Sequence, residues 1–253
     1  MKSHYILFIL ALLLGACRKT DQTTSTDEAM IEDINDPVNG FNIEESDPTA
    51  VFIADKVMTA MGGRKAWDET RYIQWHVGNN RYTWAKYIDS LRIDILPNND
   101  VILMDLKKKT GKAKIDQQEV NNPDSLAKYL TQANETWNTD SYALFMPYKL
   151  KDNGVTLYYL GEETTGDGRD AQKIQIEFTN ALPLYDIWVD AETNLISQTA
   201  YYPTTSYPEP TDTLIWNDYH RYGKILLSTD GASHPISDIR TLTNVPSGTF
   251  TTL

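Results

Sequence analysis

The most constraining feature of this sequence is a period-two alternation of apolar residues that begins at residue 73. Ile73, Trp75 and Val77 alternate with polar or less apolar neighbours, and a Gly-Asn-Asn turn sequence follows at 78–80. Successive side chains of a β-strand point to opposite faces, so this period is typical of a strand with one buried face. Short polar turns join antiparallel neighbours. The pattern predicts an antiparallel meander.

The same pattern returns along most of the chain and predicts a single, mainly β domain of about ten or eleven strands. A domain of this size is compatible with a barrel or a sandwich. The expected strands cover residues 73–77, 82–86, 91–95, 101–104, 155–160, 173–178, 185–189, 195–202, 213–219, 225–229 and 236–245.

Two or three helices accompany the strands, so the expected class is α+β. Asp47 can cap a helix that begins at Pro48, and apolar residues then recur at helical spacing up to a glycine pair. Asn122-Pro123 predicts a second helix, with one face formed by Leu126, Leu130, Ala133 and Trp137. A third, short helix is expected over 141–146, because Pro147 would end it.

The N-terminus has the layout of a secretory signal peptide, which we assign to residues 1–16. Lys2 precedes an apolar run at 5–14, and small residues come before Cys17, the single cysteine of the chain. The run is too short to cross a bilayer, which needs about 20 residues. The pattern resembles a bacterial lipobox. By that resemblance Cys17 is the lipidated first residue of the mature protein; an unmodified thiol is the alternative.

The segment after the cysteine, residues 17–49, is expected to be an acidic flexible tether. Residues 20–50 contain nine acidic residues and no lysine or arginine. Such a segment cannot bury enough apolar surface to offset its ordering entropy. The folded domain is therefore expected over 50–253. The whole chain has 23 Lys+Arg against 35 Asp+Glu and a formal net charge of −12, which gives nucleic-acid binding no electrostatic support.

Several short sequences in the second half resemble a known family. They are Trp188-Val189-Asp190, the turn at 193–196, Trp216-Asn217-Asp218-Tyr219 and the segment 222–226; Met61-Gly62-Gly63 and Trp67 resemble the start of uncharacterised LolA-like lipoproteins. The whole is similar to the LolA/LolB-like superfamily of lipoprotein-carrier folds. The resemblance implies a half-open, strongly curved antiparallel β-barrel capped by helices around an apolar cavity. Known members carry acyl chains or sense lipoproteins. Their soluble carriers are not lipidated, whereas the outer-membrane acceptors are, and the lipidation expected at Cys17 therefore departs from the soluble carriers.

No motif of enzymatic chemistry is present in the sequence. The mature chain keeps His76, His220 and His234, and no two of them have the spacing of a zinc site. There is no nucleophile elbow and no phosphate-binding glycine loop. The segment 166–170 has too few carboxylates for calcium and is better explained as a hairpin turn. We expect no catalytic residue, no metal and no cofactor, with a hydrolase as the less favoured alternative.

Tryptophans are the candidate ligand-contacting residues. Trp188 and Trp216 lie midway along two expected neighbouring strands, and Trp75 and Trp84 occupy corresponding places in the first hairpin. The strands of Trp188 and Trp216 are apolar on both faces, which suits a sheet whose concave face lines a cavity. If the domain binds an apolar ligand, we expect some of these four indoles to line the site. A completely filled core is the alternative.

The expected function is a membrane-anchored lipoprotein that binds an acyl chain, a lipid or a lipoprotein in the half-barrel. The alternative is a non-enzymatic accessory lipoprotein that docks on an envelope complex through exposed aromatic residues. The expected location is the bacterial cell envelope, where a lipid on Cys17 would anchor the protein to the membrane. Arg18 follows the cysteine where an aspartate can act as an inner-membrane retention signal, so we expect the outer membrane.

Overall fold

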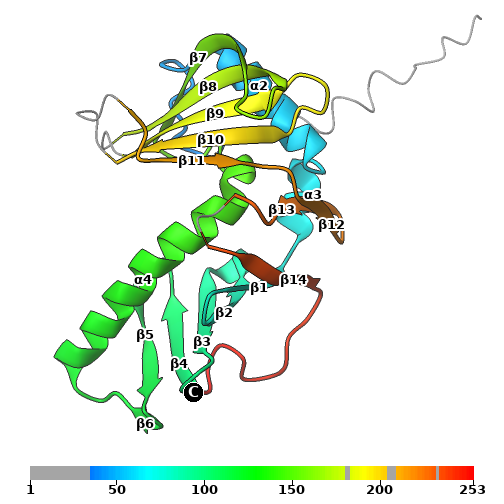
Figure 1. Cartoon of the computed structure of the whole chain (residues 1–253). Helices are drawn as coiled ribbons and strands as arrows, with labels where there is room; N and C mark the ends of the chain where they lie inside the picture. Colours follow the sequence, from blue (N-terminus) through cyan, green and yellow to red (C-terminus); the bar gives the residue numbers. More distant parts are fainter. Residues whose placement is uncertain (1–34, 180–182, 204–208, 232–233) are drawn as a thin grey trace, which may run out of the picture. The chain divides into compact units, whose positions relative to one another are not determined.

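The computed structural model describes residues 35–179, 183–203, 209–231 and 234–253 (Figure 1). Three α-helices and fourteen strands lie in these residues, and the two large antiparallel sheets are curved and do not close. The expected mainly β, α+β class with a half-open barrel and helices is confirmed. None of the helices in these ranges is long and apolar enough to cross a membrane.

The larger sheet has seven strands in the order β14-β1-β2-β3-β4-β5-β6. Consecutive strands pair antiparallel across short turns, and the last strand of the chain returns to pair with the first, with Val77 opposite Ile236. Its strands are β1 Tyr72–Val77, β2 Asn80–Ala85, β3 Ser90–Ile95, β4 Asp100–Asp105, β5 Thr110–Ile115, β6 Gln118–Glu119 and β14 Ile236–Leu242.

The second sheet has five antiparallel strands in the order β11-β10-β9-β8-β7, and β12 and β13 form a separate pair. Its strands are β7 Val155–Thr164, β8 Asp170–Phe178, β9 Leu184–Asp190, β10 Ile196–Tyr202 and β11 Asp212–Ile215; the pair consists of β12 Tyr219–Tyr222 and β13 Ile225–Ser228.

The described strands outnumber the ten or eleven that we expected, for two reasons. The expected strand at 213–219 is two strands, β11 and β12, because the chain leaves the sheet at Trp216 and turns. Strands β5 and β6 escaped prediction because they are rich in lysine and polar residues and carry little apolar alternation. Backbone pairing holds both at the edge of the sheet, since β5 pairs with β4 and β6 pairs with β5.

The helices start where the sequence predicts. In α2 (Pro48–Ala60) the Asp47 carboxylate accepts a 2.8 Å bond from the Thr49 amide, and in α4 (Pro123–Phe145) Asn122 plays the same role. Helix α3 spans Arg64–Glu69, and two short 3-10 turns are η1 (Lys86–Ile88) and η2 (Met146–Tyr148). The expected separate helix over 141–146 is wrong. Neither glycine nor proline interrupts the chain before Pro147, so α4 continues through it.

Residues 35–47 pack against the domain, which corrects part of the expected tether at 17–49. The amide of Asn42 donates to the Val155 carbonyl at 3.0 Å, and the Asp47 amide donates to the Leu157 carbonyl at 2.8 Å. Phe41 is buried in the core. One aromatic side chain and a row of backbone bonds are enough to hold an acidic segment that has no apolar periodicity. The expected signal peptide at 1–16, Cys17 and the rest of the tether lie outside the described residues.

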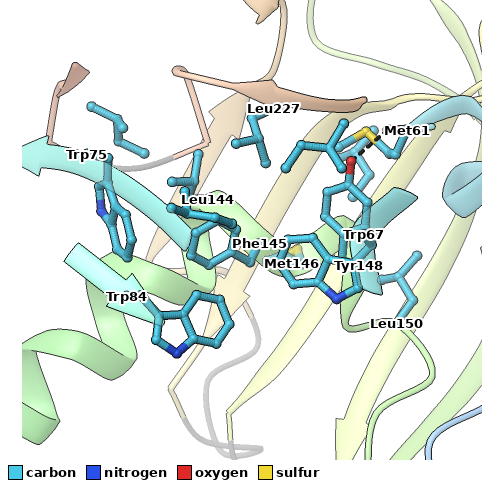
Figure 2. Packing of buried hydrophobic residues seen from close by; sticks show 14 of the residues in the cluster. Met61, Trp67, Trp75, Trp84, Leu144, Phe145, Met146, Tyr148, Leu150 and Leu227 are labelled. Carbon is cyan, nitrogen blue, oxygen red and sulfur yellow. Dashed lines mark hydrogen bonds between the residues drawn. The ribbon is translucent and has the colours of Figure 1, made fainter. Parts of the chain in front are cut away.

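The inner face of the seven-stranded sheet packs on α4 through an aromatic cluster. The Trp137 ring of α4 lies 5.6 Å from that of Trp75 and 5.2 Å from that of Trp84. Phe145 contacts both Trp75 and Trp84 (Figure 2). Gly111 on β5 is required chiefly by the neighbouring strand, since a Cβ there would clash with the Leu103 carbonyl oxygen of β4 and would also lie 3.0 Å from Leu130 Cδ2 of the helix. Large aromatic side chains bury about 150–250 Å² each, so this cluster is a main source of stability.

A second anchor joins α2, η2 and β13. The Tyr148 hydroxyl lies 2.6 Å from the Met61 carbonyl oxygen and 3.1 Å from the Leu226 amide, and its ring stacks on Trp67 at 4.3 Å (Figure 2). Gly62 follows with φ +115°, and a Cβ there would lie 2.5 Å from the Lys224 carbonyl oxygen. The glycine pair after α2 therefore does more than end the helix, because it admits β13 against the helix terminus.

Candidate functional site

A cavity of about 660 Å³ lies between the C-terminal half of α4 and the inner face of the five-stranded sheet. Figure 1 shows α4 running from the side of β5 to that sheet. Ligand pockets in proteins measure about 300–1,000 Å³. The lining residues are Val77, Asn138, Thr139, Asp140, Ser141, Tyr142, Met146, Lys149, Phe178, Pro183, Tyr185, Thr199, Tyr201, Asp212, Leu214, Gly231 and His234.

Strand register brings the wall of the cavity together. Tyr185 on β9 lies opposite Tyr201 on β10, and Tyr201 lies opposite Asp212 on β11. Two residues away on the same strands, Thr199 of β10 lies opposite Leu214 of β11. Because directly opposed residues of an antiparallel pair point to the same face, these side chains form one continuous surface.

The surface is aromatic. The Tyr142 ring of α4 lies 5.8 Å from Phe178 and 5.1 Å from Tyr185, and Tyr185 lies 5.1 Å from Tyr201. Burial raises the pKa of Tyr142 and Tyr185 well above the ordinary phenol value, so both are neutral at physiological pH. The Tyr142 hydroxyl is buried without a hydrogen-bond partner among the described residues. This wall suits apolar, chain-like ligands rather than charged ones.

Ionisable groups also line the cavity. The Asp140 carboxylate accepts a 2.6 Å bond from the Tyr82 hydroxyl, and burial raises the pKa of Asp140 despite that bond and the nearby His234. Lys149 follows η2, and burial lowers the pKa of its ammonium group while Asp152 opposes the shift. Asp140 and Lys149 make the cavity amphipathic, with charge beside an aromatic wall.

None of the four expected tryptophans is among the residues that line the cavity. Trp75 and Trp84 lie together against α4, and the indole N–H of each is buried without a partner among the described residues. Trp216 is 0 % exposed, and its N–H donates to the Thr199 hydroxyl at 3.1 Å, directly behind the cavity wall. That these indoles contact a ligand stays a prediction.

Trp188 lies on the other face of the five-stranded sheet. Its neighbours Ile187 and Val189 belong to the main core, whereas Trp188 packs in a separate small cluster with Ala171 and Ala200. Its N–H donates to Glu163 at 2.9 Å, and the Lys173 ammonium lies 4.3 Å from its ring centre. Strand β10 separates β9 from β11, so Trp188 and Trp216 are not on neighbouring strands as expected.

Phe178, Tyr185 and Tyr201 were not singled out from the sequence. The available signal was the placement of aromatic residues on alternating positions at the ends of consecutive strands. Pairing between strands decides which of these positions share a face, and this pairing includes a register shift between Ile196 and Gln198. A single sequence does not reveal such pairing.

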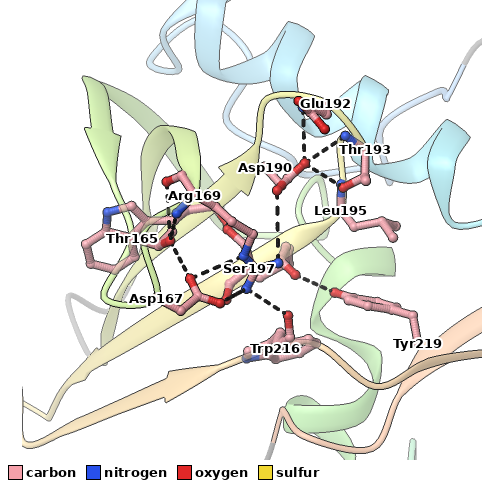
Figure 3. Close-up of polar contacts among 12 residues, drawn as sticks. Thr165, Asp167, Arg169, Asp190, Glu192, Thr193, Leu195, Ser197, Trp216 and Tyr219 are labelled. Carbon is pink, nitrogen blue, oxygen red and sulfur yellow. Dashed lines mark hydrogen bonds and ion pairs between the residues drawn. The ribbon is translucent and has the colours of Figure 1, made fainter.

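The segment 166–170 is a hairpin turn, as the sequence predicts. The Thr165 amide donates to the Arg169 carbonyl at 2.9 Å, closing the turn between β7 and β8 (Figure 3). The Arg169 guanidinium pairs with Asp167 at 2.8 Å and donates to the Ser197 carbonyl. Bonds from Thr193 hold the pKa of Asp190 below its ordinary value against the opposing effect of burial. These carboxylates are thus satisfied by the protein.

Among the residues that the structure describes, no group of three or more histidine, cysteine, aspartate or glutamate side chains could hold a metal ion. The structure is an open, mainly β domain with an amphipathic cavity beneath its five-stranded sheet. What such a cavity can do chemically is bind a ligand that combines an apolar chain with a polar group.

No protein-family profile matches the chain. No curated protein matches it either. Among solved structures it is similar to a DUF1329 family protein from Desulfovibrio piger ATCC 29098, with 12% identity and a TM-score of 0.43 over 81% of this chain and 98% of that one. It is also similar to a "putative outer membrane lipoprotein-sorting protein domain" from Vibrio parahaemolyticus, with 11% identity and a TM-score of 0.40 over 80% and 96%. Likenesses at this level assign no family and no function.

Proposed function

We propose that this protein is a lipid-anchored envelope lipoprotein that binds an acyl chain of a lipid or lipoprotein in the cavity beneath the five-stranded sheet. The observation that carries the proposal is the cavity itself, about 660 Å³ with Phe178, Tyr185 and Tyr201 on its wall. The resemblance to LolA/LolB-like carriers and the lipobox-like sequence before Cys17 agree with this function. No enzymatic step is part of it.

Burial of a chain in this cavity is favourable enough to give measurable affinity. Each methylene removed from water contributes about 0.8 kcal/mol. Ordering of the ligand and lost translational freedom offset part of that gain. Ten buried methylenes contribute about 8 kcal/mol before these costs, so a ten-carbon chain is expected to bind saturably but more weakly than micromolar, and a longer chain more tightly. The rigid tyrosine rings lose little side-chain entropy on binding, which favours an aromatic wall for this purpose.

The anchor and the cavity are separate parts of the proposal. Lipidation at Cys17 would hold the protein at the outer membrane, where acyl-chain ligands are present, and the segment 18–34 would connect the anchor to the domain. The expected partners are the membrane and a lipid or lipoprotein ligand. An envelope protein partner belongs to the alternative, in which the domain docks on a complex and holds no ligand.

Native mass spectrometry of the protein purified from its own envelope tests the proposal. We expect a co-purifying lipid-sized mass on the wild type. Thr139 lies exposed on α4 at the cavity, so Thr139→Trp should block the cavity without disturbing the core and remove that mass. Thr136→Trp is the matched control, because Thr136 is equally exposed on α4 and does not line the cavity. A bare wild-type mass would contradict the proposal and favour the accessory role.

A further inference from the structure

Lys149 is a cation in the lining of the cavity whose sheet side is aromatic. It follows η2, and its side chain lines the cavity together with Tyr142 and Met146. The residue is only partly exposed. Among the described residues, its ammonium group makes no ion pair within 4.0 Å and no hydrogen bond, whereas its neighbour Lys151 pairs with Asp55. Lys149 thus differs from the structural lysine two residues away.

The acidic residues of the cavity do not satisfy Lys149. The Asp140 carboxylate is engaged by Tyr82 at 2.6 Å, and Asp212 also has an interaction partner. Asp152 attracts Lys149 but lies beyond ion-pair distance. A cation withdrawn from water without a close counter-ion costs free energy, and an anionic partner in the same cavity would recover it.

We infer that Lys149 binds the head group of the ligand, and that the ligand is a single-chain amphiphile with an anionic head whose tail lies on the wall of Phe178, Tyr185 and Tyr201. This inference rests on the proposed function and narrows its ligand class. The lowered pKa that burial gives Lys149 agrees with it, because an anion in the cavity would restore the charged form. A carboxylate and a phosphate monoester share the required chemistry.

A series of ten-carbon amphiphiles tests the inference without any change in the cavity. The full-length protein carrying Cys17→Ala, so that no anchor is attached, is titrated by calorimetry at pH 7 with decanoate, decyl phosphate, decanol and decyltrimethylammonium. The three ionic amphiphiles are kept below their micelle concentrations, and decanol is kept below its solubility limit. We expect at least one of the two anions to bind about tenfold more tightly than decanol or the cation. The comparison of decanoate with decyl phosphate identifies the preferred head group.

Variants in the same background locate the effect. Lys149→Met should weaken the affinity for the preferred anion about tenfold and leave the affinity for decanol unchanged. Lys149→Arg should retain most of the preference for the anion. Lys108→Met is the matched control for net charge, since Lys108 is exposed on a turn of the other sheet and does not line the cavity. Lys149→Met removes an unpaired charge from a partly buried position. The midpoint temperature of thermal unfolding of the ligand-free protein should therefore not fall.

The outcomes separate the two proposals. Equal affinity of wild type for decanoate, decyl phosphate and decanol overturns the head-group role and leaves the acyl-chain cavity standing. If Lys149→Met weakens the affinity for the anion and for decanol equally, the head-group role is also overturned, because Lys149 would then only shape the cavity. If none of the four amphiphiles binds, the proposed function fails, and the inference fails with it.

Discussion

The Tyr82 hydroxyl donates a 2.6 Å hydrogen bond to the Asp140 carboxylate and so joins β2 to the part of α4 that lines the cavity. Tyr82 belongs to the aromatic cluster beneath α4 and stacks on Trp75 at 5.1 Å. The bond therefore connects the main core to the candidate site. The bond also gives the partly buried Asp140 carboxylate a hydrogen-bond donor, at a position that would otherwise favour an apolar side chain.

This pair predicts a pH-dependent gain in stability for Asp140→Asn. Burial raises the pKa of Asp140 in the folded state, so the folded protein binds the proton more tightly than the unfolded chain. The stability of the wild type falls as pH rises from the unfolded pKa of about 3.9 through the raised value, and stays lower above it. Asparagine keeps an acceptor for Tyr82 and carries no charge.

We therefore expect Asp140→Asn to be more stable than wild type at pH 7, with the difference shrinking toward pH 4. Urea unfolding at the two pH values measures it. Asp124→Asn, in the exposed first turn of the same helix, is the control and should gain nothing at pH 7, since an acid there favours the helix dipole. A variant that is less stable than wild type at pH 7 would show that the carboxylate charge stabilises the fold.

Loss of the Tyr148 hydroxyl should weaken the anchor between α2 and β13. Tyr148→Phe keeps the stack on Trp67 and removes the bond to the Met61 carbonyl, so we expect a loss of about 1–2 kcal/mol in the free energy of unfolding. Urea denaturation with an unchanged m-value is the measurement. Tyr129→Phe is the control, because Tyr129 on α4 is also packed against the core but its hydroxyl makes no hydrogen bond to a described residue, and it should change stability by less than about 0.5 kcal/mol. Equal small effects in both variants would mean that the anchor contributes little.

Gly62→Ala should be among the costlier small substitutions in the chain. The new Cβ would meet the Lys224 carbonyl oxygen at 2.5 Å, and alanine is strained at φ +115°. We expect a loss of about 3 kcal/mol or more in the free energy of unfolding. Gly168→Ala isolates the backbone strain, because Gly168 has φ +89° with no atom within 4 Å of its Cβ position, and should cost only about 1 kcal/mol. Similar losses would argue against the close approach of β13.

The elements that the sequence predicts well are those set by local interactions. The start of α2 follows from Asp47 and Pro48, and the start of α4 from Asn122 and Pro123, because a cap bonds amides two or three residues away. Strands β1 to β3 follow from alternation over five or six residues, and β4 follows from the apolar run at 101–104. Neither signal depends on distant parts of the chain.

The cavity could not be predicted in the same way, because it depends on long-range pairing. Tyr142 on α4 meets Tyr185 on β9, 43 positions further along the chain, and nothing local to either residue indicates the contact. The separation of Trp188 from β11 by the intervening strand β10 likewise follows from long-range pairing. Apolar alternation predicts which residues share one face of a strand, but it does not predict which strand lies next to it.

Lipidation at Cys17 is testable independently of the cavity. Cells grown with labelled palmitate should incorporate the label into the wild type and not into Cys17→Ala, because the thiol is the acceptor that the lipobox-like sequence predicts. The wild type should also fractionate with the outer membrane. Equal labelling of both proteins would contradict lipidation at this residue, and an inner-membrane location would overturn the expected role of Arg18.

The most direct test of the account is the place where an acyl chain contacts the protein. A palmitate analogue with a photoreactive diazirine on its chain is added to isolated envelopes, irradiated and mapped by tandem mass spectrometry of the purified protein. We predict adducts on the cavity wall at Phe178, Tyr185 or Tyr201, competed by unlabelled palmitate and reduced in Thr139→Trp but not in Thr136→Trp. Adducts at Trp75, Trp84 or Trp216 would extend the site toward the indoles expected from the sequence. Labelling that no competitor reduces, or that lies on the Trp188 face of the sheet, would contradict the account.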